Sequence, residues 1–170
     1  MTTTGIEDAR HQLNLVLSFF SRVDAKASVV LAVNTGMLAV VASNAPPLHK
    51  MSLLSGVLAI ITVLIIGGSL WFLYRIAFPA LSGGQRSLVY FREIANRTEA
   101  NFIDEFAQQD DQSRMKDLLG QVWRNSEILR LKFDALRVAF ILMAIAILPW
   151  VAAVAMFSAQ NADARSLLMR

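Results

Sequence analysis

The chain has 170 residues and a formal net charge of only +3, with 55% hydrophobic and 17% charged residues. This composition and the mean hydropathy of +0.49 lie outside the usual range of soluble domains, so they indicate a membrane protein. The chain has no cysteine, which excludes a disulfide framework, a thiolate metal site and a cysteine nucleophile. Because His11 and His49 are far apart in the sequence, we expect no histidine metal site either.

Residues 1–24 have the spacing of an amphipathic helix, which we expect to continue directly into a membrane span. The run Ala27–His49 carries no charged residue, and the pair Pro46-Pro47 closes it, so the first span lies at about 26–45. We expect no cleaved signal peptide, because the start, MTTTGIEDAR, lacks the basic region of such peptides.

Two further charge-free runs, Met51–Tyr74 and Val138–Ala162, are long enough to cross a bilayer, since about 20 helical residues span its hydrocarbon core. The sequence therefore predicts an all-α membrane protein with three transmembrane helices and a helical cytoplasmic bundle. The regions that we expect are a cytoplasmic amphipathic helix at 1–24, a transmembrane hairpin at 25–78 with spans at about 26–45 and 52–75, a helical cytoplasmic segment at 79–135, a third span at 136–158 and an extracytoplasmic tail at 159–170.

The distribution of lysine and arginine predicts the topology, because cytoplasmic flanks carry the excess of these residues. Only Lys50 lies between the first two spans, whereas the segment between the second and third spans is rich in both residue types. The amino terminus and the long middle segment are therefore expected in the cytoplasm, and the carboxyl terminus on the opposite side of the membrane.

The cytoplasmic segment reads as helix throughout. SLVYFREIAN has apolar residues on one face, Thr98 fits an N-cap, and a further apolar stripe runs from Met115 without a breaker into the third span. We therefore expect one long helix from about Asp111 to about Ser158, within a bundle of four helices. Because this bundle is small, and because Asn34-Thr35-Gly36 suggests a close-packing face, we also expect a homo-oligomer.

Motifs that would carry catalysis are missing from the sequence. It has no glycine-rich loop of phosphate-binding spacing and no plausible serine–histidine–acid set, so we expect neither an enzyme nor a bound cofactor. Asp24 and Lys26 stand at the start of the first span, and Asn34 lies near its middle. Two interpretations stay open for the charged pair, namely simple anchoring at the headgroup level and a role in gating at the membrane junction.

Three stretches resemble one known family. DAKASVVLAVNTGMLAV is similar to the D-x-K-A-S…L-x-V-N-x-x-x-L stretch at the first span of the Pycsar transmembrane effectors. SLVYFREIANRTEANFIDEF resembles the L-x-Y-F-x-x-I-A segment of that family, and DLLGQVWRNSEILRLKFDALRVAF resembles its D-L-x-x-Q-V-x-x-x-S-x-I-x-x-x-K-F stretch. These stretches occur in the family's order and extend over nearly the whole chain.

The resemblance implies a function. In a Pycsar system a cyclase answers phage infection by making cyclic CMP or cyclic UMP, and the transmembrane effector senses this nucleotide and impairs the inner membrane, which aborts the infection. The expected partners are thus the lipid bilayer and a cyclic pyrimidine nucleotide, with no nucleic acid. The alternatives are a non-signalling membrane anchor or assembly subunit, and a small constitutive channel.

A cyclic pyrimidine nucleotide requires a cation for its phosphate and a flat surface for its base. Aromatic and arginine residues on the cytoplasmic helices are the candidates, although each could instead be core or solvated. The expected ligand-binding residues are Tyr90, Phe91, Arg92, Arg97, Trp123 and Arg124, and the expected junction residues are Asp24, Lys26 and Asn34.

Overall fold

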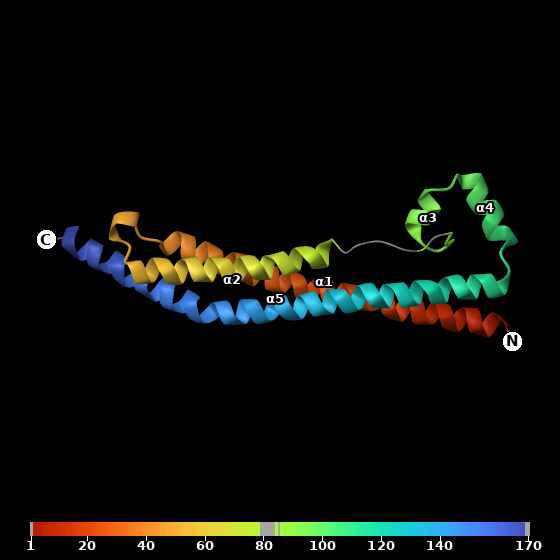
Figure 1. Cartoon of the computed structure of the whole chain (residues 1–170), viewed down its shortest axis with the longest axis horizontal. Coiled ribbons are helices and arrows are strands. Elements are labelled where there is room, and N and C mark those ends of the chain that lie inside the picture. Colours follow the sequence, from red (N-terminus) through yellow and green to blue (C-terminus); the bar gives the residue numbers. More distant parts are fainter. Residues whose placement is uncertain (1, 79–83, 85, 169–170) are drawn as a thin grey trace. The chain divides into compact units, whose positions relative to one another are not determined.

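A computed structural model describes residues 2–78, 84 and 86–168, and the side chains of 4–78, 84 and 86–162. Its described residues form helices and connections without a strand (Figure 1). The elements are α1 (Thr2–Asn44), the 3-10 helix η1 (Leu48–Lys50), α2 (Leu53–Ala77), α3 (Phe91–Ala95), α4 (Glu99–Gln108) and α5 (Asp111–Leu168). Three of them, α1, α2 and α5, are long and apolar enough to cross a membrane. The predicted fold class is confirmed.

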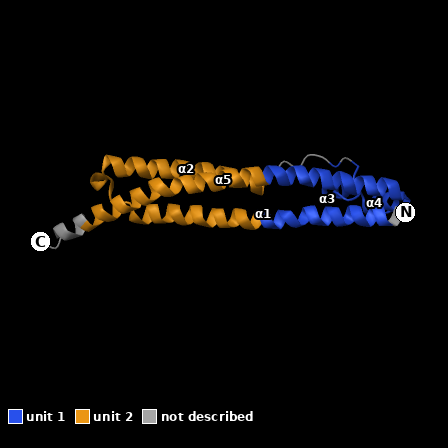
Figure 2. Ribbon diagram, turned by 90° about the horizontal axis from the view of Figure 1, so that it is seen from below, with its two compact units in different colours: residues 1–23, 79–132 blue, residues 24–78, 133–170 orange. Residues whose placement is uncertain are grey.

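The chain divides into two compact units (Figure 2). Unit 1 comprises residues 1–23 and 79–132, and unit 2 comprises residues 24–78 and 133–170. Helices α1 and α5 each begin in unit 1 and continue without a break into unit 2. Each of these two helices therefore supplies residues to both units.

Unit 2 is built from three helices that lie side by side (Figure 1). Its buried residues recur three, four or seven positions apart along each helix, which is the spacing of helices that pack nearly parallel or antiparallel. On α2 the buried positions include Ser55, Thr62 and Ser69, each seven residues from the next. Small side chains at such positions let transmembrane helices approach closely.

Hydrogen bonds between side chains and backbone fix the register of unit 2. Trp150 Nε1 of α5 donates to the Met37 carbonyl of α1 over 2.9 Å. Further toward the carboxyl ends of both helices, Asn161 Nδ2 of α5 donates to the Asn44 carbonyl of α1 over 2.9 Å. Because the higher-numbered residue of α5 contacts the higher-numbered residue of α1, these two helices run parallel in this unit.

Unit 1 has a small apolar core. Ala9 and Leu13 of α1 are buried against Leu118 of α5, and partly buried apolar residues, Val89 among them, pack on this cluster. Lys132 of α5 places its ammonium 5.3 Å from the centre of the Phe20 ring, which is a cation–π distance. The N-cap prediction for α4 is confirmed, since Thr98 Oγ1 accepts a hydrogen bond from the Asn101 N–H.

Two expectations about helix extent need correction. SLVYFREIAN was expected to be helical, but α3 has only 5 residues, because the N–H groups of residues 88–90 donate to side chains and not to a preceding turn of helix. The long helix begins at Asp111 as expected, but it ends at Leu168 and not near Ser158. Pro149 lies inside it.

The grouping of Asn34 with Thr35 and Gly36 as one packing face is wrong. Asn34 is completely buried inside unit 2, whereas Thr35 and Gly36 are exposed. Successive helical residues are turned by about 100° from one another, so the three cannot share a face. The amide therefore packs within the protomer.

Candidate ligand site

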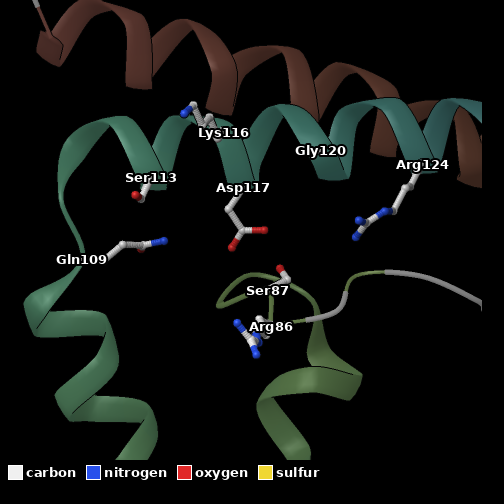
Figure 3. Close-up of a pocket in the computed structure, with 8 residues that line it drawn as sticks. All are labelled: Arg86, Ser87, Gln109, Ser113, Lys116, Asp117, Gly120 and Arg124. Carbon is white, nitrogen blue, oxygen red and sulfur yellow. The ribbon is translucent and has the colours of Figure 1, made fainter.

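A pocket of about 310 Å³ lies in unit 1, between α5 and the loop of residues 86–90 that precedes α3 (Figure 3). Residues from three segments line it: the loop, the end of α4 and one face of the first turns of α5. The lining residues are Arg86, Ser87, Gln109, Ser113, Lys116, Asp117, Gly120 and Arg124. The positions on α5 recur three or four residues apart, which places them on one side of that helix.

The loop is held to α5 by polar contacts at its centre. The Leu88 N–H donates to Asp117 Oδ2 over 2.8 Å, and the buried amide of Gln121 donates to Ser87 Oγ over 3.0 Å. The same Ser87 oxygen accepts the N–H groups of Val89 and Tyr90. These contacts satisfy the backbone of a tight turn, so the loop has a defined conformation beside the pocket.

Arg86 occupies a strained position at the pocket edge. Its φ of 62° lies in the left-handed region, which residues other than glycine seldom adopt, and its N–H donates to Glu93 Oε2 over 2.9 Å. Such strain persists where the surrounding contacts impose it, and it concentrates at functional sites.

Figure 3 shows Asp117 and Arg124 pointing from α5 toward the loop that carries Arg86 and Ser87, while the Lys116 side chain lies along α5 instead. The pocket lining therefore contains three cationic residues, Arg86, Lys116 and Arg124, and one carboxylate, which already accepts the Leu88 N–H. Arginines in a pocket lining suit a phosphate ligand, because guanidinium groups form strong, charge-assisted hydrogen bonds with phosphate.

An aromatic ring lies next to Arg124. A Cβ atom placed on Gly84 would lie 2.6 Å from Cδ1 of Tyr90 and 3.2 Å from a terminal nitrogen of Arg124. Gly84 also has a φ of 89°, so a side chain at this position would be strained as well as crowded. The half-buried Tyr90 ring and the Arg124 guanidinium thus both reach the space beside Gly84.

Arg97 holds the loop in place and does not line the pocket. Its guanidinium donates to the carbonyls of Ser87 and Glu93, at 3.2 and 2.7 Å, and forms an ion pair with Glu105 at 3.0 Å. Its side chain is 13% exposed, so most of the group is used in these contacts.

The structure separates the six residues that the sequence suggested for ligand binding. Arg124 lines the pocket, Tyr90 lies next to it, and Arg97 supports the loop. Phe91 and Trp123 are each 63% exposed and, like the exposed Arg92, are absent from the lining.

Sequence reasoning missed most of the pocket. Arg86 was passed over because the glycines before it lack phosphate-binding spacing, and of the lining residues on α5 only Arg124 was named as a candidate. The usable signal was the helical spacing of Asp117, Gly120 and Arg124 beside an apolar stripe.

The three junction residues lie in unit 2. The Asp24 carbonyl accepts the Ser28 hydroxyl over 3.0 Å, and Lys26 lines a groove between α1 and α5. Asn34 Nδ2 donates to Ser69 Oγ over 2.7 Å. The structure therefore assigns Asn34 a partner on α2 and leaves Asp24 and Lys26 at the start of the apolar part of α1.

The family model described as "Pycsar effector protein domain" matches residues 8–159 of the chain. The chain belongs to the Pycsar effector family. No curated protein and no solved structure matches it. The match begins within α1 and ends within α5, so it includes the pocket and all three apolar helices.

Membership of the Pycsar effectors indicates a role in antiphage defence and a cyclic nucleotide signal from a cyclase system. With its apolar helices, it also indicates a membrane protein. Two residues of the family-like stretches, Asp117 and Gln121, are those that hold the pocket loop. These two family-like residues therefore lie at the candidate site.

Proposed function

We propose that this Pycsar effector senses cyclic CMP or cyclic UMP and then impairs the bacterial inner membrane, which causes abortive infection. Unit 1 is the cytoplasmic sensor and unit 2 the membrane part, with the amino terminus inside, in keeping with the excess of lysine and arginine in the middle segment. The protein acts by binding and not as an enzyme, and its working form is a homo-oligomer.

One observation carries the proposal. Helix α5 supplies Asp117 and Arg124 to the pocket of unit 1 and then continues into unit 2 as an apolar helix long enough to span a membrane. A ligand that shifts the start of α5 acts on the same continuous helix that is long and apolar enough to cross the bilayer. Coupling between sites requires such a shared element, whose equilibrium both sites bias.

Arg86 and Arg124 bind the single negative charge of the cyclic phosphate, and the Tyr90 ring supports the pyrimidine base. The pocket volume of about 310 Å³ is at the lower end for small-ligand sites, which favours a compact mononucleotide. The alternatives of a membrane anchor and a constitutive channel give no reason for an arginine pair in a pocket beside a strained loop.

The test is equilibrium binding of cyclic CMP and cyclic UMP to the purified full chain, with linear CMP and cyclic AMP as comparisons. Arg86→Gln and Arg124→Gln are each expected to weaken binding by about 10-fold or more, since hydrogen bonds to charged groups contribute about 1.5–3 kcal/mol. Arg130→Gln is the matched control, because Arg130 is an exposed cation of α5 outside the pocket. Tyr90→Phe keeps the ring and is expected to keep affinity, whereas Tyr90→Leu is expected to lower it.

Failure to bind either cyclic pyrimidine nucleotide, in protein that is folded and monodisperse, contradicts the proposal. Equal losses for Arg130→Gln and the two pocket variants would reject this pocket as the site. A constitutive channel predicts killing without a cyclase, and an anchor predicts no killing at all, so expression with and without the cyclase separates the alternatives.

A further inference from the structure

A second concave region lies in unit 2, where α1 and α5 run side by side. It is a groove of about 460 Å³ with one cation on each helix, Lys26 and Arg137. Its apolar lining consists of Val29, Val30, Phe133, Leu136, Phe140 and Ile141. Val30 and Leu136 are buried and form its floor, while Val29 and Phe140 are 64% and 55% exposed. The groove therefore presents a long apolar surface with positive charge.

The position of the two cations along their helices is informative. Lys26 immediately precedes the charge-free run that begins at Ala27, and Arg137 immediately precedes the one that begins at Val138. Because α1 and α5 run parallel in this unit, both cations mark the same end of the apolar part of the bundle. In a membrane this end lies at the level of the phosphate groups.

We infer that the groove binds one anionic phospholipid, whose phosphate contacts Lys26 and Arg137 and whose acyl chain lies on the apolar residues. A phospholipid combines a phosphate with a hydrocarbon chain. Its phosphate matches the two cations of the groove, and its acyl chain matches the apolar residues. A free phosphate would leave the apolar lining without a partner. This inference does not depend on nucleotide sensing in unit 1.

A second copy of the chain is the competing occupant. In a symmetric dimer whose two copies contact each other through this groove, Lys26 and Arg137 would face the same two cations of the second copy. Like charges at close range repel, so the groove is poorly suited to itself. An anionic lipid instead neutralises both cations.

The experiment is native mass spectrometry of the full chain released from nanodiscs of mixed phosphatidylglycerol and phosphatidylcholine. The wild-type chain is expected to retain one phosphatidylglycerol in preference to phosphatidylcholine. Lys26→Gln and Arg137→Gln are each expected to lower this retention by about five-fold, the effect of about 1 kcal/mol per basic residue. Arg75→Gln, which removes an exposed cation at the end of α2 outside the groove, is expected to change nothing.

Two further pairs of variants test the charge and the shape of the groove separately. Lys26→Arg and Arg137→Lys keep the charges and are expected to keep the lipid, so a loss in the glutamine variants cannot be ascribed to misfolding. Val29→Trp fills the groove without changing any charge and is expected to lower retention. Leu64→Trp places the same ring on an exposed position of α2 outside the groove and is expected to have no effect.

Equal retention of the two lipids, or unchanged retention in both glutamine variants, overturns the inference. Displacement of the lipid by excess inorganic phosphate would identify a free-anion site instead. Dissociation of an oligomer in Val29→Trp, with lipid retention unchanged, would identify the groove as a subunit interface.

Discussion

Asn34 Nδ2 donates a hydrogen bond to Ser69 Oγ over 2.7 Å, and this bond joins α1 to α2 inside unit 2. Ser69 Oγ in turn donates to the Ala139 carbonyl of α5 over 2.8 Å, so one hydroxyl links all three apolar helices. Both side chains are completely buried. Asn34 Oδ1 has no hydrogen-bond partner among the described residues, which leaves one polar atom of the link unsatisfied.

This link predicts unequal effects for its two members. Ser69→Ala removes both bonds and leaves the Asn34 amide unpaired, so it is expected to destabilise the protein by about 1–2 kcal/mol. Asn34→Leu removes one bond together with the unsatisfied oxygen, and is expected to cost less. Unfolding of the full chain in mixed detergent micelles measures both.

Thr62→Ala is the matched control, because the buried Thr62 hydroxyl donates to a carbonyl of its own helix, at Leu58, and so makes a bond within α2. A cost for Asn34→Leu equal to or above that for Ser69→Ala would contradict the link as described. The double variant is expected to cost less than the two single variants together, since they share one bond.

Gly120 allows helix stability and ligand binding to be separated. It lies within α5 and lines the pocket, and a Cβ at this position would meet no atom within 4 Å. Gly120→Ala is therefore expected to stabilise α5 by about 1 kcal/mol. If the pocket holds the nucleotide, the same methyl group occupies ligand space and weakens nucleotide binding several-fold.

Gly36→Ala is the control, since Gly36 is a helical glycine of α1 with equally open space. It is expected to stabilise its helix while nucleotide affinity stays the same. Thermal unfolding and equilibrium binding of both variants check the pair, and unchanged affinity in Gly120→Ala would count against this pocket.

The start of α5 is expected to depend on pH through Asp110. Its carboxylate accepts the Ser113 N–H, and this hydrogen bond lowers the pKa of the Asp110 carboxyl below its usual value. A depressed folded-state pKa means that the stabilisation is present above the unfolded pKa, about 3.9, and is lost as the pH falls below it. Hydrogen-exchange protection in the first turn of α5 is expected to fall in that window.

Asp110→Asn provides the comparison, because asparagine caps helices about as well as aspartate but does not titrate. Its protection is expected to stay constant through the same pH range. Asp110→Ala is expected to lose protection at every pH. A pH-dependent loss of equal size in Asp110→Asn would assign the effect to another carboxyl group.

Asp24 and Lys26 provide a test of the junction in the proposed signalling. Both precede the apolar part of α1, a helix that begins in unit 1 and ends in unit 2. Asp24→Ala or Lys26→Ala is expected to abolish killing or to free it from the nucleotide, while nucleotide affinity shifts much less. The reason is that moving a charge from the headgroup level toward the bilayer centre costs about 2.5–3.5 kcal/mol.

Growth assays at equal expression, with and without the cyclase, measure this effect, and Lys26→Arg is the charge-keeping control. Normal, ligand-dependent killing in Asp24→Ala, Lys26→Ala and Lys26→Arg would contradict a role in signalling. Asp24 and Lys26 would then only anchor the helix at the headgroup level.

The sequence by itself determined the membrane class, the three apolar helices and the N-cap at Thr98. These features depend on local properties. The free energy of transferring a charge-free run into lipid depends on the residues of that run alone. A capping side chain bonds to an N–H three residues away, so neither feature requires knowledge of a distant partner.

Only the tertiary structure decided which residues form the pocket and which polar groups pair in the bundle. Asp117 binds the Leu88 N–H across 29 positions, and Asn34 binds Ser69 across 35. Helical periodicity gives the face on which a residue lies. It does not show which helix packs against that face, or which residues of that helix lie opposite. For that reason Arg86 was overlooked, and Asn34 was assigned to the wrong face.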